Sequence, residues 1–63
     1  MNNRLQTLRW DKDWSQGKLS RLSGVPRSTI SAIESGTTNN PSIETALLLA
    51  KALGIPVESI FSL

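Results

Sequence analysis

Apolar residues recur at helical spacing along most of the chain, and this pattern predicts an all-α fold with five helices. The first predicted helix runs from about Asn3 to Lys12, with Asn2 or Asn3 as its N-cap. Its inward stripe is expected to contain Leu5, Leu8 and Arg9. No segment alternates between apolar and polar residues for long enough to predict a strand.

Two short helices joined by a tight turn at Gly24 are predicted between residues 16 and 35. Ser15 is a good N-cap for the first of them, and Trp14 is placed to pack on Leu19 as a hydrophobic staple. The second helix begins at Pro26 or Arg27 and ends near Ser35. The side chains expected to face inward are Leu19 and Leu22 in the first helix, and Ile30 and Ile33 in the second.

Residues 36–41 have the composition of a loop, and two more helices are predicted after it. Ser42 is the expected N-cap of the fourth helix, Gly54 ends it, and Pro56 opens a short fifth helix. Ile60 and Phe61 are expected to close the core. The inward face of the fourth helix is predicted to consist of Ile43, Ala46, Leu49, Ala50 and Leu53.

Length and composition limit the chemistry that this chain can support. Its 63 residues are enough for a single domain, residues 1–63, and 38% of them are apolar, as in soluble globular domains. Without cysteine or histidine, the chain lacks the commonest metal ligands and the commonest general base, and its few carboxylates are not grouped. We therefore expect no enzyme activity, metal or cofactor. Because no apolar run reaches the roughly 18–20 residues of a membrane span, and no signal peptide is recognisable, we expect a cytoplasmic protein without membrane contact.

Positive charge is concentrated in the first half of the chain. The net charge is only +2, but six of the seven basic residues precede Ser28, and only Lys51 follows it. This asymmetry suggests a basic face, although a solvated surface would explain it as well. In the second helix of the predicted pair, Arg27, Ser28 and Ser31 point outward. A short helix that presents small polar groups and a guanidinium suits the major groove of DNA.

Five sequence fragments, in order, resemble the lambda-repressor and Cro type of helix-turn-helix domain. They are L-x-x-L-R, W-S-Q-x-x-L, S-G-V-P-R-S-T-I-S-x-I-E-S-G, N-P-S-I-E-T and L-A-K-A-L-G-I-P-V-E-S-I-F, which together reach from Leu5 to Phe61. The resemblance implies a five-helix, lambda repressor-like bundle, with the helix-turn-helix at residues 16–35, that binds double-stranded operator DNA and regulates transcription. A repressor is preferred over an activator. Three residues depart from the family pattern: Ser20 replaces a small alanine, Pro26 replaces a serine or threonine cap, and Leu48 replaces a polar surface residue.

The resemblance also assigns contacts to DNA. It places Arg27, Ser28 and Ser31 at base edges, with the methyl group of Ala32 available to a thymine. The phosphate contacts that it implies are Gln16, Thr29, Ser35, Asn39 and Asn40. Simple turn chemistry is the stronger explanation for at least one of the two asparagines.

Arg9 and Glu34 are predicted to form a buried or half-buried ion pair. Each lies on the apolar stripe of its own helix, where a lone charge would be costly, and their signs are opposite. The resemblance implies the same pair, linking the first helix to the third.

One short helix contacts only a few base pairs, so we expect a homodimer, at least on DNA. The dimer contacts are predicted around Leu48, Val57, Phe61 and Leu63, although these residues could instead close the core of the monomer. The alternative function is a protein-interaction module such as an antitoxin or anti-repressor. The small polar outer face of the third helix favours DNA, because a protein-binding face would carry an apolar cluster. The operator, any effector, the sign of regulation, and whether a longer protein contains this domain are left open.

Overall fold

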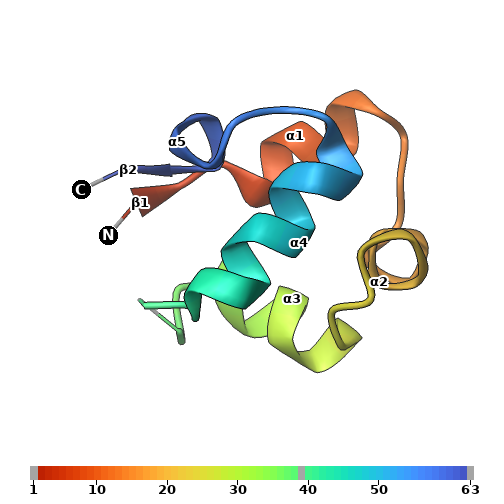
Figure 1. The fold of residues 1–63 in the computed structure, drawn as a ribbon. Helices are drawn as coiled ribbons and strands as arrows, with labels where there is room; N and C mark the ends of the chain where they lie inside the picture. The colour runs from red at the N-terminus through yellow and green to blue at the C-terminus, as the bar shows by residue number, and fades with distance from the viewer. Residues whose placement is uncertain (1, 39, 63) are drawn as a thin grey trace.

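The computed structural model describes residues 2–38 and 40–62, which form five helices and one small two-stranded ribbon (Figure 1). The helices are α1 (Leu5–Asp11), α2 (Gln16–Ser23), α3 (Arg27–Ser35), α4 (Ile43–Leu53) and α5 (Val57–Ile60). The strands are β1 (Asn2–Asn3) and β2 (Phe61–Ser62). The predicted all-α class is confirmed.

The starts of α2 and α4 follow the capping signals in the sequence. The side chains of Ser15 and Ser42 accept hydrogen bonds from the backbone N–H groups of the third residue after each of them. The predicted start of the first helix is wrong: the N-cap of α1 is Arg4, without a side-chain cap, because Asn2 and Asn3 belong to strand β1. The Oδ1 of Asn3 still accepts from the N–H of Leu5 at 3.2 Å. Gly24 ends α2 with φ of 80°, a left-handed conformation that glycine adopts without steric cost.

Strands β1 and β2 pair in antiparallel register, with Asn2 opposite Ser62 and Asn3 opposite Phe61. The ribbon continues into a hydrogen bond from the N–H of Arg4 to the carbonyl of Ile60, at 2.8 Å. The two ends of the described chain therefore lie side by side (Figure 1). The expectation that no strand would form is wrong for these four residues, because a two-residue strand is too short to show alternation.

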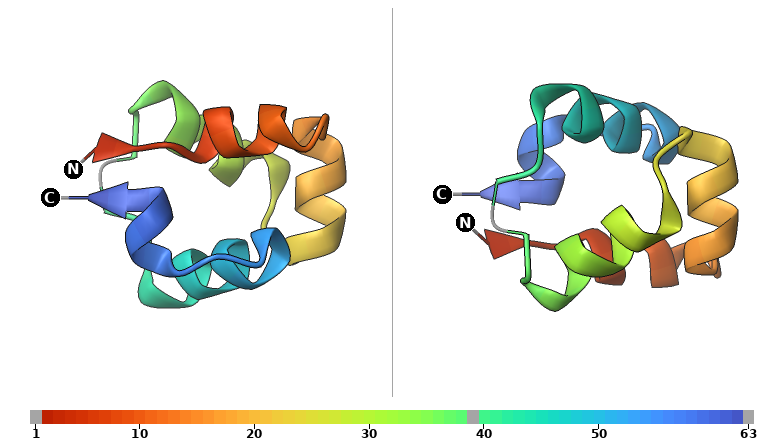
Figure 2. Two further views of the ribbon diagram at one scale, coloured as in Figure 1. Left: turned by 90° about the horizontal axis from the view of Figure 1, so that it is seen from above. Right: turned by 90° about the horizontal axis from the view of Figure 1, so that it is seen from below.

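Figure 2 shows how the helices are arranged around the core. Helices α1 and α3 lie together on one side of the molecule, α4 and α5 lie on the opposite side, and α2 closes one end. The core between them is built from side chains of every helix, and its members are Leu5, Leu19, Val25, Ile30, Ile33, Leu49, Ala50, Leu53 and Ile60.

Two side chains that were predicted to face inward are exposed instead. Leu22 is 53% exposed, because α2 packs through Leu19 and Ser23 and leaves the flank with Leu22 uncovered. Ile43 is 79% exposed at the first position of α4, where the helix has not yet reached its neighbours. Both lie at the edge of an apolar stripe, and the helical period alone does not say how far the core extends around the helix.

Candidate DNA-binding surface

Helices α2 and α3 form the predicted helix-turn-helix, and two serines hold the turn between them. The hydroxyl of Ser20 donates to the carbonyl of Val25 at 2.6 Å, and the hydroxyl of Ser23 accepts from the N–H of Val25 at 3.1 Å. The serine that replaces the family's alanine therefore adds a hydrogen bond across the turn. Pro26 precedes α3 without a side-chain cap, as its lack of a polar side chain predicts.

The outer face of α3 is polar and accessible. Arg27, Ser28 and Ser31 are exposed, whereas Ile30 and Ile33 on the inner face are buried. Ala32 and Thr29, at the margins of the outer face, are half-buried. The structure thus brings the four side chains suggested for base contacts onto one accessible side of a nine-residue helix.

Arg9 and Glu34 lie together between α1 and α3. Arg9 Nε is 2.8 Å from Glu34 Oε2 and Arg9 Nη2 is 3.0 Å from Glu34 Oε1, so the contact is bidentate. The two side chains are 8% and 3% exposed. Arg9 Nη1 also donates to the carbonyl of Trp14 at 2.7 Å, which ties the loop before α2 to the same pair.

Each partner of the pair shifts the pKa of the other in the direction that favours its charged form. Burial by itself raises the pKa of the Glu34 carboxyl, but the hydrogen bonds from Arg9 and Gln16 and the charge of Arg9 outweigh it and lower the pKa overall. The hydrogen bond to Glu34 is the main cause of a raised pKa at Arg9. The charges are therefore compensated within the protein and need no ligand.

Gln16, suggested as a phosphate contact, belongs to this cluster. Its Nε2 donates to Glu34 Oε1 at 3.1 Å, which holds the side chain of the first residue of α2 against α3. Ser15 accepts from the N–H of Lys18, so the N–H groups of Gln16 and Gly17 remain without a partner inside the helix. Backbone donors at this helix start, together with the helix dipole, favour an anion such as a phosphate.

The remaining suggested phosphate contacts lie near the end of α3. Ser35 is exposed, but its hydroxyl already hydrogen-bonds locally, to the carbonyl of Ala32 at 3.2 Å and to the hydroxyl of Thr37 at 2.9 Å. Asn40 is exposed in the loop before α4, and Asn39 lies outside the described residues. Ser35 thus contributes to the end of its own helix as well as to the surface.

Most of the predicted dimer contacts are partly used by the core of the monomer. Three of them are half-buried and pack against it, namely Leu48, Val57 and Phe61, and Leu63 lies outside the described residues. The outer surface of α4 is apolar, which was not predicted: Ile43 and Leu47 are 79% and 56% exposed. The period of α4 could have indicated Leu47, since it follows Ile43 by one helical turn and lies just outside the predicted inward stripe.

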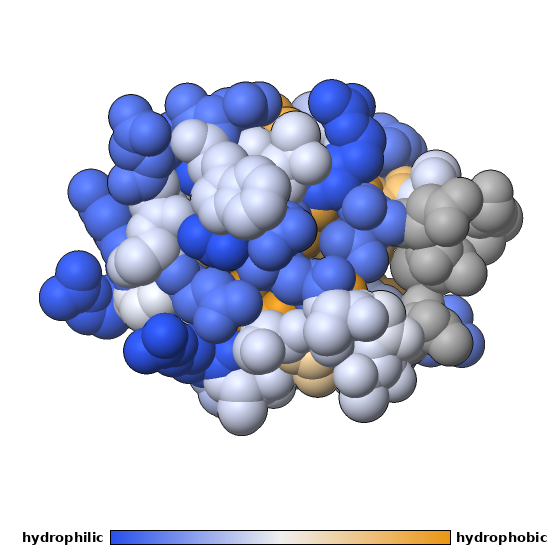
Figure 3. Space-filling model, turned by 180° about the vertical axis from the view of Figure 1, so that it is seen from behind, coloured by the Kyte–Doolittle hydropathy of each residue, from blue (hydrophilic) through white to orange (hydrophobic). Residues whose placement is uncertain are grey.

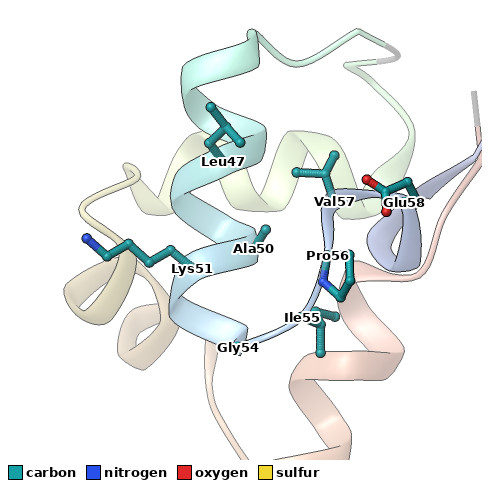
Figure 4. Close-up of a pocket in the computed structure, with 8 residues that line it drawn as sticks. All are labelled: Leu47, Ala50, Lys51, Gly54, Ile55, Pro56, Val57 and Glu58. Carbon is teal, nitrogen blue, oxygen red and sulfur yellow. The ribbon is translucent and has the colours of Figure 1, made fainter.

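A groove of about 570 Å³ runs between α4 and the segment that leads into α5 (Figure 4). Leu47, Ala50 and Val57 supply apolar surface to it, and Lys51 and Glu58 supply opposite charges. Over residues 2–38 and 40–62, no helix is both long and apolar enough to cross a bilayer.

The fold and the exposed helix α3 define a DNA-binding domain of the helix-turn-helix class. A helix-turn-helix family model matches residues 5–60, and the chain belongs to this family, in its Cro/C1 type.

Relatives and a solved structure agree with this class. The chain is 40% identical over 61 residues to the uncharacterised HTH-type transcriptional regulator YgzD of Bacillus subtilis, covering 97% of this chain and 91% of that protein. It is 39% identical, with the same coverage, to the uncharacterised HTH-type transcriptional regulator MJ0272 of Methanocaldococcus jannaschii. The crystal structure of the restriction-modification controller protein C.AhdI from Aeromonas hydrophila is similar, with a TM-score of 0.84, 41% identity, and coverage of 92% of this chain and 86% of that one.

Proposed function

We propose that this chain is a sequence-specific repressor that binds an operator with α3 in the major groove. The observation that carries the proposal is the contrast across α3, which buries Ile30 and Ile33 and exposes Arg27, Ser28 and Ser31. Arg27 would contact guanine through two parallel hydrogen bonds, and Ser28 and Ser31 are too short to obstruct it. Similarity to proteins named as transcriptional regulators supports a regulatory role. Repression needs no further site, because the bound domain alone can block a promoter.

Phosphate contacts would set the orientation of α3 in the groove. Gln16 is the best placed, because its amide is held by Glu34 and the unpaired N–H groups at the start of α2 lie beside it. Thr29, Ser35 and Asn40 are secondary candidates on the flanks of α3 and in the loop that follows it. Glu34 bonds to both Arg9 and Gln16. These bonds would fix the position of the phosphate contact on α2 relative to the base contacts on α3.

We further propose that the protein binds DNA as a symmetric dimer through the outer surface of α4 and the groove beside α5. Ile43, Leu47 and Val57 provide the apolar part of this surface. In a twofold interface both subunits present the same patch, so Lys51 of one copy can face Glu58 of the other, twice. Leu48 and Phe61 are left out of this surface: like Val57 they pack against the core of their own subunit, but of the three only Val57 also lines the groove.

Selection of binding sites from random duplex DNA tests both parts of the proposal. We expect enrichment of a short motif that occurs twice, related by a twofold axis, with centres about 34–36 Å apart. Recovery of no motif would contradict sequence-specific binding. Recovery of one unpaired motif, with a monomer on DNA in sedimentation, would contradict the dimer and leave the role of α3 intact.

A further inference from the structure

Trp10, near the end of α1, is a large side chain without an assigned role. It is 57% exposed, although tryptophan is usually well covered in folded proteins. The other large exposed apolar side chains among the described residues are Leu22 on α2, and Ile43 and Leu47 on α4. Trp10 is therefore separate from the apolar surface that we assign to the dimer.

Helical geometry places Trp10 on the side of α1 that borders α3. Arg9 points to Glu34 on α3, and Trp10 follows it, about 100° further around the helix. Gln6, one turn before Trp10, is also exposed, whereas Leu8 on the other flank of α1 packs against the core. On this exposed flank of α1, the residue next to the ion pair is therefore Trp10.

Helices α1 and α3 form one continuous face of the molecule (Figure 2). Figure 3 shows this face as mostly hydrophilic. A surface for a protein partner would carry several apolar side chains together, whereas Trp10 is a single aromatic residue in polar surroundings. A DNA backbone fits such surroundings better, because it combines phosphate oxygens with small apolar sugar rings.

The indole also has the chemistry for this contact. It offers one N–H donor and two apolar ring faces. The guanidinium carbon of Arg9 lies 5.9 Å from the centre of the Trp10 ring, so the ring lies next to the ion pair that joins α1 to α3. We propose that Trp10 contacts the sugar–phosphate backbone next to the base pairs that α3 contacts, donating its N–H to a phosphate oxygen. This inference rests on the proposed function, because it needs α3 to be in the groove.

The competing explanation is that Trp10 only covers the ion pair of Arg9 and Glu34. Binding of a random-sequence duplex at low ionic strength separates the two, since a backbone contact does not depend on sequence. We expect Trp10→Ala to weaken binding about tenfold to 100-fold, as for loss of a hydrogen bond to a charged group, and Trp10→Phe to fall between it and the wild type. The salt dependence should not change, because no cation is removed.

Leu22→Ala is the matched control, since Leu22 is exposed to a similar degree and lies near the end of α2, far from Gln16 at its start. It should bind DNA like the wild type. If Trp10→Ala is folded by circular dichroism and binds within twofold of the wild type, the inference is wrong and the ring has only a structural role. If the wild type binds neither the random duplex nor selected sites, the proposed function is wrong, and the inference about Trp10 is wrong with it.

A second measurement covers the case in which Trp10→Ala does not fold. Trp14→Phe leaves Trp10 as the sole indole and keeps the backbone carbonyl that accepts from Arg9. Addition of the duplex should reduce acrylamide quenching of Trp10 fluorescence in this variant. Unchanged quenching at saturating DNA would overturn the inference.

Discussion

Helices α3 and α4 bury apolar stripes in the same core, but their outer faces differ in kind. The outer face of α3 carries Arg27 and small hydroxyl groups, whereas that of α4 carries Ile43 and Leu47. A polar face with a guanidinium can form directional hydrogen bonds with base edges, and an apolar face gains by excluding water against a protein surface. This difference is the basis of our proposal that α3 contacts DNA and that α4 contacts a second copy of the chain.

Their inner faces differ as well. Helix α3 directs a carboxylate, Glu34, inward beside its two isoleucines, whereas the inner face of α4 is entirely apolar. The carboxylate joins α1 and the start of α2 to α3 through Arg9 and Gln16. Directional bonds therefore align the helices near the DNA-binding face, and less specific apolar packing is sufficient for α4.

The largest expected effect is on stability, at the inner face of α3. Glu34→Ala leaves Arg9 buried without its partner, and we expect the free energy of unfolding to fall by about 3–5 kcal/mol. Glu44→Ala, at an exposed position of α4, should cost less than about 1 kcal/mol. Urea unfolding followed by circular dichroism measures both. A Glu34→Ala protein within 1 kcal/mol of the wild type would show that the pair contributes little.

The two inner faces should also respond differently to pH. Because the pKa of Glu34 is lowered in the folded protein, its contribution is complete above the unfolded pKa of about 4.3 and is lost as the pH falls through the folded pKa. The stability difference between wild type and Glu34→Gln should therefore shrink below about pH 4. The cost of Leu49→Ala on α4, about 2–5 kcal/mol, should not depend on pH in this way. Parallel pH profiles for the two variants would contradict this distinction.

On the outer face of α3, we expect Arg27→Ala to weaken binding to a selected site by about 1–3 kcal/mol and to remove the preference at one base pair in each half-site. Competition against random duplex DNA measures the specific part of the loss. An equal loss on selected and random DNA would show that Arg27 contacts only phosphate, and specificity would then depend on Ser28, Ser31 and Ala32.

The smallest expected effect concerns the outer face of α4. Leu47→Glu places a charge in the proposed dimer surface, and we expect it to weaken self-association at least about tenfold without loss of the folded monomer. Leu22→Glu, at a similarly exposed position on α2, is the control and should not change association. Sedimentation equilibrium on DNA half-sites and full sites compares the two. Equal behaviour of the variants would remove α4 from the interface.

Local signals in the sequence were sufficient to predict the helices and the turn. Ser15 and Ser42 cap helices where predicted, and Gly24 has the left-handed conformation that the turn requires. Opposite charges on two apolar stripes predicted contact between Arg9 and Glu34, and the structure brings them within 2.8 Å. These inferences succeed because capping, glycine geometry and the cost of a buried lone charge depend on few residues at a time.

Only the tertiary structure decided which flank of each helix's apolar stripe is covered by a neighbouring helix. It also decided which residues far apart in the sequence come into contact. The helical period gives the direction of Leu22 and Ile43 around their helices, but their exposure depends on where neighbouring helices end. The ribbon between β1 and β2 and the bond from Gln16 to Glu34 likewise join segments far apart in the chain. The sequence by itself determined the helices and the chemistry that they carry. The packing of those helices determined which side chains are left to contact DNA or a second copy of the chain, because exposure is a property of neighbours in space.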